Sequence, residues 1–223
     1  MLEQIKILST VVPIVFFVIF CKKKATKELW VFFIYCILSF SFDMFLSLSI
    51  WASEHTFLVW NFFGVIENIL LSYFFYIVIN QRLIRSAIIL LSFSYVIFSF
   101  FHFNTNTEQF NSINGAIGLV ILLFLCLCYF INIMKPSSTP TNIYTPVFVI
   151  VFAMILSISS TLFLTVVSNQ FTKNEMQKYW NISSYANILM NLIVSSAFIL
   201  FYNQHKPKPT ESNFVDFTSP NDR

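Results

Sequence analysis

Long apolar runs alternate with short polar segments along nearly the whole chain. A helix that crosses a bilayer needs about 20 mostly apolar residues. Such runs must be helical, because lipid offers no hydrogen-bond partner to an open sheet edge. The pattern predicts an all-α, polytopic integral membrane helical bundle of seven transmembrane helices over 1–203, followed by a disordered polar tail over 204–223. The expected spans are 7–21, 29–52, 57–79, 86–103, 115–134, 143–168 and 180–202.

Composition supports a membrane protein. Of the 223 residues, 57% are hydrophobic and 10% are charged, whereas a soluble domain usually carries about 25% charged residues. The lipid bilayer is therefore the first partner that we expect. Only three glycines occur, which excludes glycine-rich phosphate loops. No nucleic-acid partner is expected, and the oligomeric state is left open.

The basic residues predict the orientation, because cytoplasmic loops carry an excess of Lys and Arg. Ten basic residues follow the first, third, fifth and seventh spans, and three lie on the opposite side. This asymmetry predicts an outside N-terminus and a cytoplasmic C-terminus in an inner (plasma) membrane. The first span is expected to be an uncleaved anchor, because its charges follow the apolar run. The ten are Lys22, Lys23, Lys24, Lys27, Arg82, Arg85, Lys135, Lys206, Lys208 and Arg223; the three are Lys6, Lys173 and Lys178.

Two carboxyl side chains lie deep within predicted spans, Asp43 in the second and Glu67 in the third. Intramembrane carboxylates are costly and commonly functional. At 1.5 Å per residue, both lie about 14–15 Å below the outer ends of their helices, so they are expected to meet at one level. No Lys or Arg is expected inside any span to pair with them. They are then protonated, share a proton, or bind a cation or a ligand amine.

Uncharged polar residues reach the same depth on other spans. On the last span, Asn187 and Asn191 follow each other at a four-residue step and therefore share a helix face. The alternative to a binding role is interhelical hydrogen bonding, which is common for Ser, Thr and Asn in membranes. The candidate polar pocket near mid-membrane comprises Asp43, Glu67, Asn68, Ser157, Ser160, Asn187 and Asn191.

No motif for catalysis or metal binding stands out. The four cysteines, at 21, 36, 126 and 128, form no Cys-x-x-Cys pair, and the three His match no zinc-ligand spacing. No serine lies in a nucleophile elbow. We therefore expect no catalytic residue of a known motif, no metal and no cofactor.

Three stretches resemble a family of small seven-span membrane proteins of unknown function found in Bacteroidota. Family members often carry His where this chain has Ser183 or Ser184. The resemblance covers nearly the whole chain and implies a seven-helix fold and topology. In that family, gene neighbourhoods near two-component systems imply a sensory role. The stretches are WNFFGVIENILLSYFFYIVI (60–79), YTPVFVIVFAMILSISSTLFL (144–164) and YWNISSYANILMNLIVSSAFIL (179–200).

Three hypotheses for function remain open. The first is a receptor-like or sensory module, in which a mid-membrane pocket binds a small ligand, lipid or ion and the cytoplasmic loops contact a signalling partner. The second is a small membrane-embedded enzyme acting on lipid, with Asp43 and Glu67 as general acid and base. The third is a pore-forming or effector protein whose polar stripes line a path. An enzyme would turn over substrate alone, whereas a sensor or a pore would depend on a stimulus or partner.

Overall fold

The structure, a computed structural model, describes residues 2–48, 56–102, 112–134, 145–167 and 173–206. Within these ranges seven helices are long and apolar enough to cross a membrane. The predicted all-helical fold and the number of candidate spans are therefore confirmed. The elements are α1 (Leu2–Phe16), a π-helical turn η1 (Phe17–Cys21), α2 (Lys27–Leu48), α4 (Thr56–Val78), α5 (Arg82–Phe101), α6 (Ser112–Met134), α7 (Pro146–Val167) and α8 (Lys173–His205).

The helices extend beyond the predicted spans at several ends. Helix α1 begins at Leu2, five residues before the expected start, and so includes Lys6. Helix α5 begins at Arg82, and α8 begins at Lys173 rather than at 180. Counting apolar residues finds the part of a helix that suits lipid, but hydrogen bonding continues through polar turns at its ends. The expectation that no span holds a Lys or Arg is wrong for α1, whose membrane-compatible stretch Gln4–Cys21 contains Lys6.

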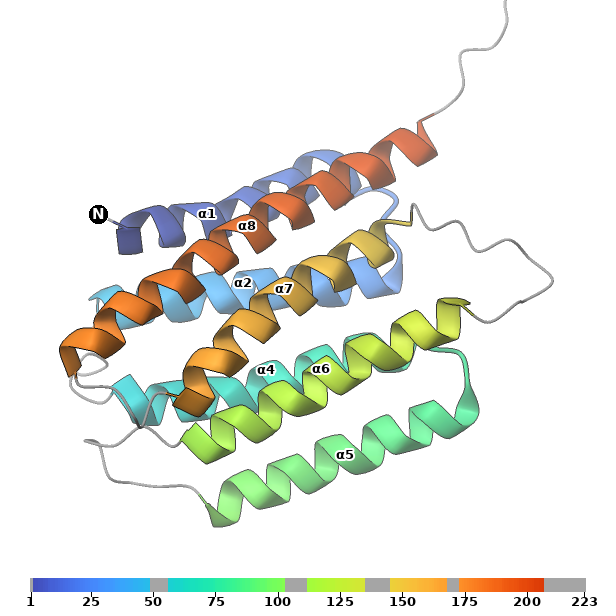
Figure 1. Cartoon of the computed structure of the whole chain (residues 1–223). Coiled ribbons are helices and arrows are strands. Elements are labelled where there is room, and N and C mark those ends of the chain that lie inside the picture. Colours follow the sequence, from blue (N-terminus) through green and yellow to red (C-terminus); the bar gives the residue numbers. More distant parts are fainter. Residues whose placement is uncertain (1, 49–55, 103–111, 135–144, 168–172, 207–223) are drawn as a thin grey trace, which may run out of the picture.

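Six of the described helices form a closed ring. Around this ring α1 packs on α2, α2 on α4, α4 on α6, α6 on α7, α7 on α8, and α8 on α1 again. Helix α5 packs outside the ring, against α4 and α6 (Figure 1). The ring brings together helices far apart in sequence, and the first and last helices lie side by side.

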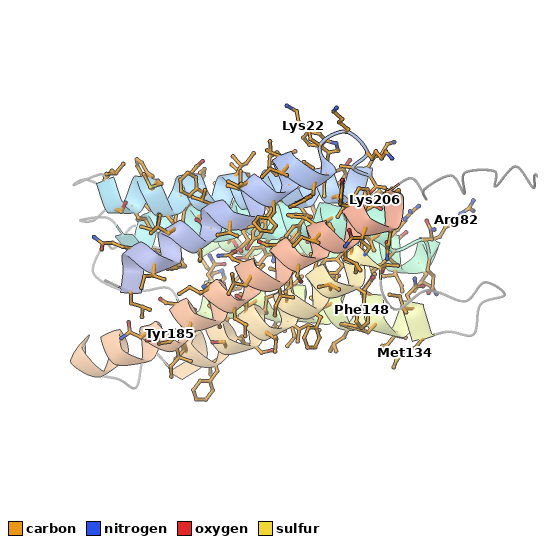
Figure 2. All side chains as sticks on the ribbon, turned by 90° about the horizontal axis from the view of Figure 1, so that it is seen from above. Lys22, Arg82, Met134, Phe148, Tyr185 and Lys206 are labelled. Atoms are coloured by element: carbon orange, nitrogen blue, oxygen red, sulfur yellow. The ribbon has the colours of Figure 1, made fainter. Side chains whose placement is uncertain are left out.

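The two ends of the bundle differ in charge. Lys22, Arg82 and Lys206 lie together at one end, which we call the basic end (Figure 2). Tyr185 lies toward the opposite end, where α1 begins, and which we call the N-terminal end. Among the described residues, the basic segments after the first span, at the start of α5 and at the end of α8 therefore lie at the same end of the bundle. The membrane side of each end stays a prediction.

The best-packed core lies in the half of the bundle at the basic end. It includes the end of the first span, the start of α2, the end of α4, the start of α7 and the end of α8. Phe17 stacks on Phe33, with 4.1 Å between ring centroids, and packs edge-on against Phe198. Interdigitated aromatic rings fill volume densely. Side chains at 0% exposure in this half include Phe17, Phe32, Phe74, Phe75, Ile79, Ile150 and Phe198.

One basic side chain closes the end of α4. The Nε of Arg85 donates to the carbonyl oxygens of Tyr76 and Ile79, at 3.0 and 2.7 Å. Its guanidinium also donates to Oδ1 of Asn80 at 2.9 Å. The last carbonyls of a helix have no partner within the helix and carry partial negative charge, so a cation stabilises them. Arg85 therefore fixes the turn between α4 and α5.

Candidate functional site: a polar cavity inside the helix ring

A cavity of about 100 Å³ lies inside the ring and reaches along the bundle from Lys6 and Thr10 on α1 to Phe32 and Leu71. All six ring helices contribute to its wall, and α5 does not. A space of this size holds several water molecules or a small ligand. Its polar lining is Lys6, Thr10, Tyr35, Ser39, Asp43, Glu67, Ser157, Thr161, Ser183, Asn187 and Asn191.

Five of the seven residues predicted from sequence face this one cavity. Asp43 comes from α2, Glu67 from α4, Ser157 from α7, and Asn187 and Asn191 from α8. These residues are separated by up to 148 positions in sequence (191 − 43), so only the closure of the ring brings them together. Whether they bind a ligand stays a prediction.

Asp43 forms an ion pair that the sequence analysis missed. The Nζ of Lys6 on α1 donates to Oδ1 of Asp43 at 2.9 Å. The side chains are 18% and 9% exposed, respectively. The expectation that no Lys or Arg within a span pairs with the acids is therefore wrong for Asp43. An opposite charge at hydrogen-bond distance offsets part of the cost of placing a carboxylate within a span.

Glu67 has a different partner. The hydroxyl of Tyr35 on α2 donates to Oε1 of Glu67 at 3.0 Å. Tyr35 precedes Asp43 by eight residues on the same helix, which is about 12 Å along the axis. The cavity therefore holds one carboxyl that is paired with an ammonium and a second that receives a neutral hydrogen bond.

The two acids lie at different depths. Next to Asp43, Phe42 stacks on Phe63 with ring centroids 3.9 Å apart. Glu67 follows Phe63 by four residues, about 6 Å further along α4. The prediction that both carboxyls share one level is thus off by about one helical turn, because the count assumed a tight hairpin with helix ends at 52 and 57.

The α7 and α8 walls are held together by hydrogen bonds between hydroxyl and amide groups. Ser157 donates to Oδ1 of Asn187 at 2.8 Å, and the hydroxyls of Thr161 and Ser183 lie 3.1 Å apart. These residues join two helices and also line the cavity. Interhelical hydrogen bonding and a polar cavity wall are therefore compatible roles for the same side chains.

Asn191 joins α8 to α1. Its Nδ2 donates to Oγ of Ser9 at 2.9 Å. Because Lys6 precedes Ser9 by almost one turn, this bond fixes α1 close to the level at which Lys6 reaches Asp43. Asn191 thus helps to position the ion pair without contacting either of its members.

The remaining two predicted residues lie elsewhere. Asn68 follows Glu67 on α4 but faces α6, where its Nδ2 donates to the carbonyl oxygen of Gly118 at 3.0 Å. Ser160 does not line the cavity, and its buried hydroxyl has no hydrogen-bond partner. Adjacent positions on a helix point about 100° apart, so depth alone does not place a side chain in a pocket.

Aromatic rings form much of the remaining wall near the ion pair. The Nζ of Lys6 lies 5.9 Å from the ring centroid of Trp60, within the range of a cation–π contact. Phe42 also packs edge-on against Trp60 at 5.6 Å. The part of the cavity nearest Lys6 and Asp43 therefore combines two charges with the flat faces of aromatic rings.

Two lining residues could have been recognised from the sequence. Tyr35, Ser39 and Asp43 follow each other at four-residue steps, so Tyr35 extends the polar stripe of α2 inward. Lys6 precedes a long apolar run by one residue, and a Lys near a helix end can lay its stem along apolar surface. Neither signal shows that Tyr35 bonds to Glu67 or that Lys6 pairs with Asp43.

Fold and site together define a class: an all-helical bundle whose candidate membrane spans enclose a polar cavity with an internal ion pair. Comparison of the chain with known protein families, with curated proteins and with solved structures gave no match. The function must therefore be argued from the cavity itself.

Proposed function

We propose that this protein is a receptor-like sensory membrane module that binds a small polar ligand in the ring cavity. The observation that carries the proposal is that all six ring helices supply wall residues to one polar cavity. A ligand that contacts every ring helix can change how those helices pack. Such a change is the simplest way for binding to reach the opposite face of a membrane.

The packing toward the basic end supports a binding cavity over a pore. Toward the basic end the cavity is bounded by Phe32, whose ring lies 5.6 Å from the ring of Phe74, and both side chains are fully buried. An ion or water path past them would require those rings to move. In this proposal the cavity is therefore a dead-end site that a ligand enters from the N-terminal end.

In this proposal the seven helices span a bacterial inner membrane, with the N-terminal end outside and the basic end in the cytoplasm. The basic residues favour this orientation by the positive-inside rule. The cavity then receives ligands from outside, and exposed Lys22, Lys23 and Arg82 are available to a cytoplasmic signalling partner. Such a partner would need an acidic surface.

The test uses two substitutions that preserve the fold. Glu67→Gln keeps an oxygen that accepts the Tyr35 hydrogen bond but removes the charge. Asn187→Ala removes one polar wall group. In a thermal-unfolding screen of the purified protein against small amines, carboxylates and lipid head-group analogues, we expect at least one compound to raise the melting temperature of the wild type. Both variants should lose that response.

The matched control is Ser196→Ala, which lies on α8 but is exposed and bonds only to the carbonyl of Ile193. It should respond as the wild type does. The proposal is contradicted if both cavity variants fully complement a deletion strain in whatever phenotype that deletion produces. Product formation by the purified protein from added lipid would instead support the enzyme hypothesis.

A further inference from the structure

A second cavity of about 80 Å³ lies beside the first, between α4, α6 and the flanking α5 and α7. The two cavities share a wall that includes Trp60, Glu67 and Thr161. Glu67 is the only acidic side chain among the described residues that line the second cavity, and no described Lys, Arg or His lines it. An acidic residue thus lines a small space to which no described cationic side chain contributes.

Asn68 follows Glu67 in the wall of this cavity. Its side chain is 1% exposed and lines the cavity wall. The carbonyl oxygen of Gly118 can only accept a hydrogen bond, so the Asn68 side chain directs its Nδ2 to Gly118. The Oδ1 of Asn68 takes no part in this hydrogen bond. That Oδ1 is buried and has no hydrogen-bond partner. A buried acceptor without a donor or cation is costly, so it is a candidate partner for a bound group.

The glycines of the chain gather at this cavity. All three, Gly64, Gly115 and Gly118, line it. A Cβ added at Gly64 would meet no atom within 4 Å. Glycine is unfavourable in a helix by about 1 kcal/mol relative to Ala, and the packing around Gly64 gives no reason for it. The absence of a side chain there keeps the space beside Asn68 and Glu67 open.

We propose that the second cavity is a binding site for a small monovalent cation, held by the Glu67 carboxylate and the Asn68 carbonyl oxygen. Hard oxygen ligands suit hard cations. A single positive charge neutralises the single carboxylate, whereas a divalent ion would leave an uncompensated charge inside the bundle. The same oxygens suit Na⁺ and a small alkylammonium, which share this chemistry.

The site deepens the proposed function, because Glu67 faces both cavities. A cation at Glu67 would fix the carboxyl that also accepts the Tyr35 hydrogen bond on the wall of the first cavity. Occupancy of the second cavity would then alter ligand affinity in the first. Cation binding itself does not require that the first cavity bind anything.

The experiment compares unfolding of the purified protein in N-methyl-D-glucamine chloride with NaCl and with methylammonium chloride at equal ionic strength. We expect at least one of the two small cations to raise the melting temperature by about 2–4 °C at a concentration of about four times its Kd. The arm that responds identifies the source of the cation. Equal melting temperatures in all three salts would overturn the proposal and would leave a buried water as the partner of Asn68.

Variants localise the effect. Asn68→Leu removes the unpartnered oxygen, and Gly64→Leu fills the space; both should abolish the cation shift. Phe62→Leu places a leucine on the exposed face of α4, and Ser92→Ala removes another buried hydroxyl that lacks a partner. Both controls should keep the shift. A full cation response in both Asn68→Leu and Gly64→Leu would refute the site.

Two further measurements keep the outcome decisive. If the leucine variants do not fold, the wild type is tested for saturable binding of ²²Na⁺. Binding that is lost in Glu67→Gln, and that methylammonium displaces if methylammonium is the stabilising cation, supports the proposal. The absence of both saturable ²²Na⁺ binding and stabilisation by methylammonium contradicts it. Asn187→Ala, which alters the first cavity alone, should keep the cation response. Failure of the ring cavity as a ligand site is thereby distinguished from failure of the cation site.

Discussion

Lys6 reaches Asp43 from the second turn of α1 and lies close to the face of Trp60. A lysine near the end of a span is tolerated because its four-carbon stem lies along apolar surface while the ammonium finds a partner. Here the partner is within the bundle. The pair therefore stabilises the contact between α1 and α2 and places a charge of each sign at the cavity wall.

At the residue scale, we expect the loss of one member of this pair to lower the free energy of unfolding more than the loss of both members. Lys6→Met leaves the Asp43 carboxylate without its cation, and we expect a loss of about 1.5–3 kcal/mol in the free energy of unfolding. Asp43→Asn should also destabilise the protein, because Lys6 then lacks its counter-charge. The double variant Lys6→Met/Asp43→Asn should lose less than the sum of the two. Denaturant unfolding in detergent measures this cycle.

The control for this cycle is Lys23→Met, an exposed lysine at the basic end. It removes the same charge without breaking an internal ion pair, so its stability should stay close to that of the wild type. Additive losses from Lys6→Met and Asp43→Asn would show that the two side chains do not interact.

At the element scale, two glycines on neighbouring helices have opposite surroundings. A Cβ at Gly118 would lie 2.6 Å from Oη of Tyr95, so α6 can approach α5 this closely only with glycine there. A Cβ at Gly64 on α4 would contact nothing within 4 Å. The same residue type thus permits close packing on α6 and preserves space on α4.

Alanine substitution should separate these two roles. Gly118→Ala forces Tyr95 or the helix to move and should destabilise the protein by about 1–3 kcal/mol. Gly64→Ala should be neutral, or stabilising by up to about 1 kcal/mol through helix propensity. Thermal unfolding of the two variants side by side provides the measurement. A larger loss for Gly64→Ala than for Gly118→Ala would contradict the packing described between α5 and α6.

At the scale of the whole molecule, the two ends of the bundle differ in packing and polarity. Apolar rings fill the bundle at the basic end, whereas the polar cavity begins at Lys6 near the N-terminal end. A bilayer gives both ends the same apolar surroundings, so this asymmetry comes from the protein and not from the lipid. Under the proposed function it favours ligand entry from the N-terminal end.

The orientation of the bundle can be tested directly. A reporter fused after Lys208 should read cytoplasmic, because ten basic residues follow the spans that end on that side. The same reporter inserted within 104–111 should read external, and one inserted within 135–144 should read cytoplasmic as an internal control. An external signal from the C-terminal fusion would reverse or break the seven-span topology.

Local chemistry was sufficient to predict the spans. The seven apolar runs predict the helices because a membrane span depends on local length and composition, which a sequence displays directly. That Asn187 and Asn191 lie on one face of α8 could also be predicted, since residues four positions apart lie on the same side of a helix, and both line the ring cavity. Asp43 and Glu67 were recognisable as unusual because a carboxyl in a span is costly wherever its helix packs.

Helix rotation and register were decided by the tertiary structure. The sequence does not show that Lys6 would reach Asp43, that Tyr35 would bond to Glu67, or that Asn68 would face α6 instead of the ring. Each depends on which faces of two helices meet, and those faces are chosen by packing of the whole ring. Local composition therefore determined what each helix is, whereas ring closure determined the relative level of its polar groups and which of them share a cavity.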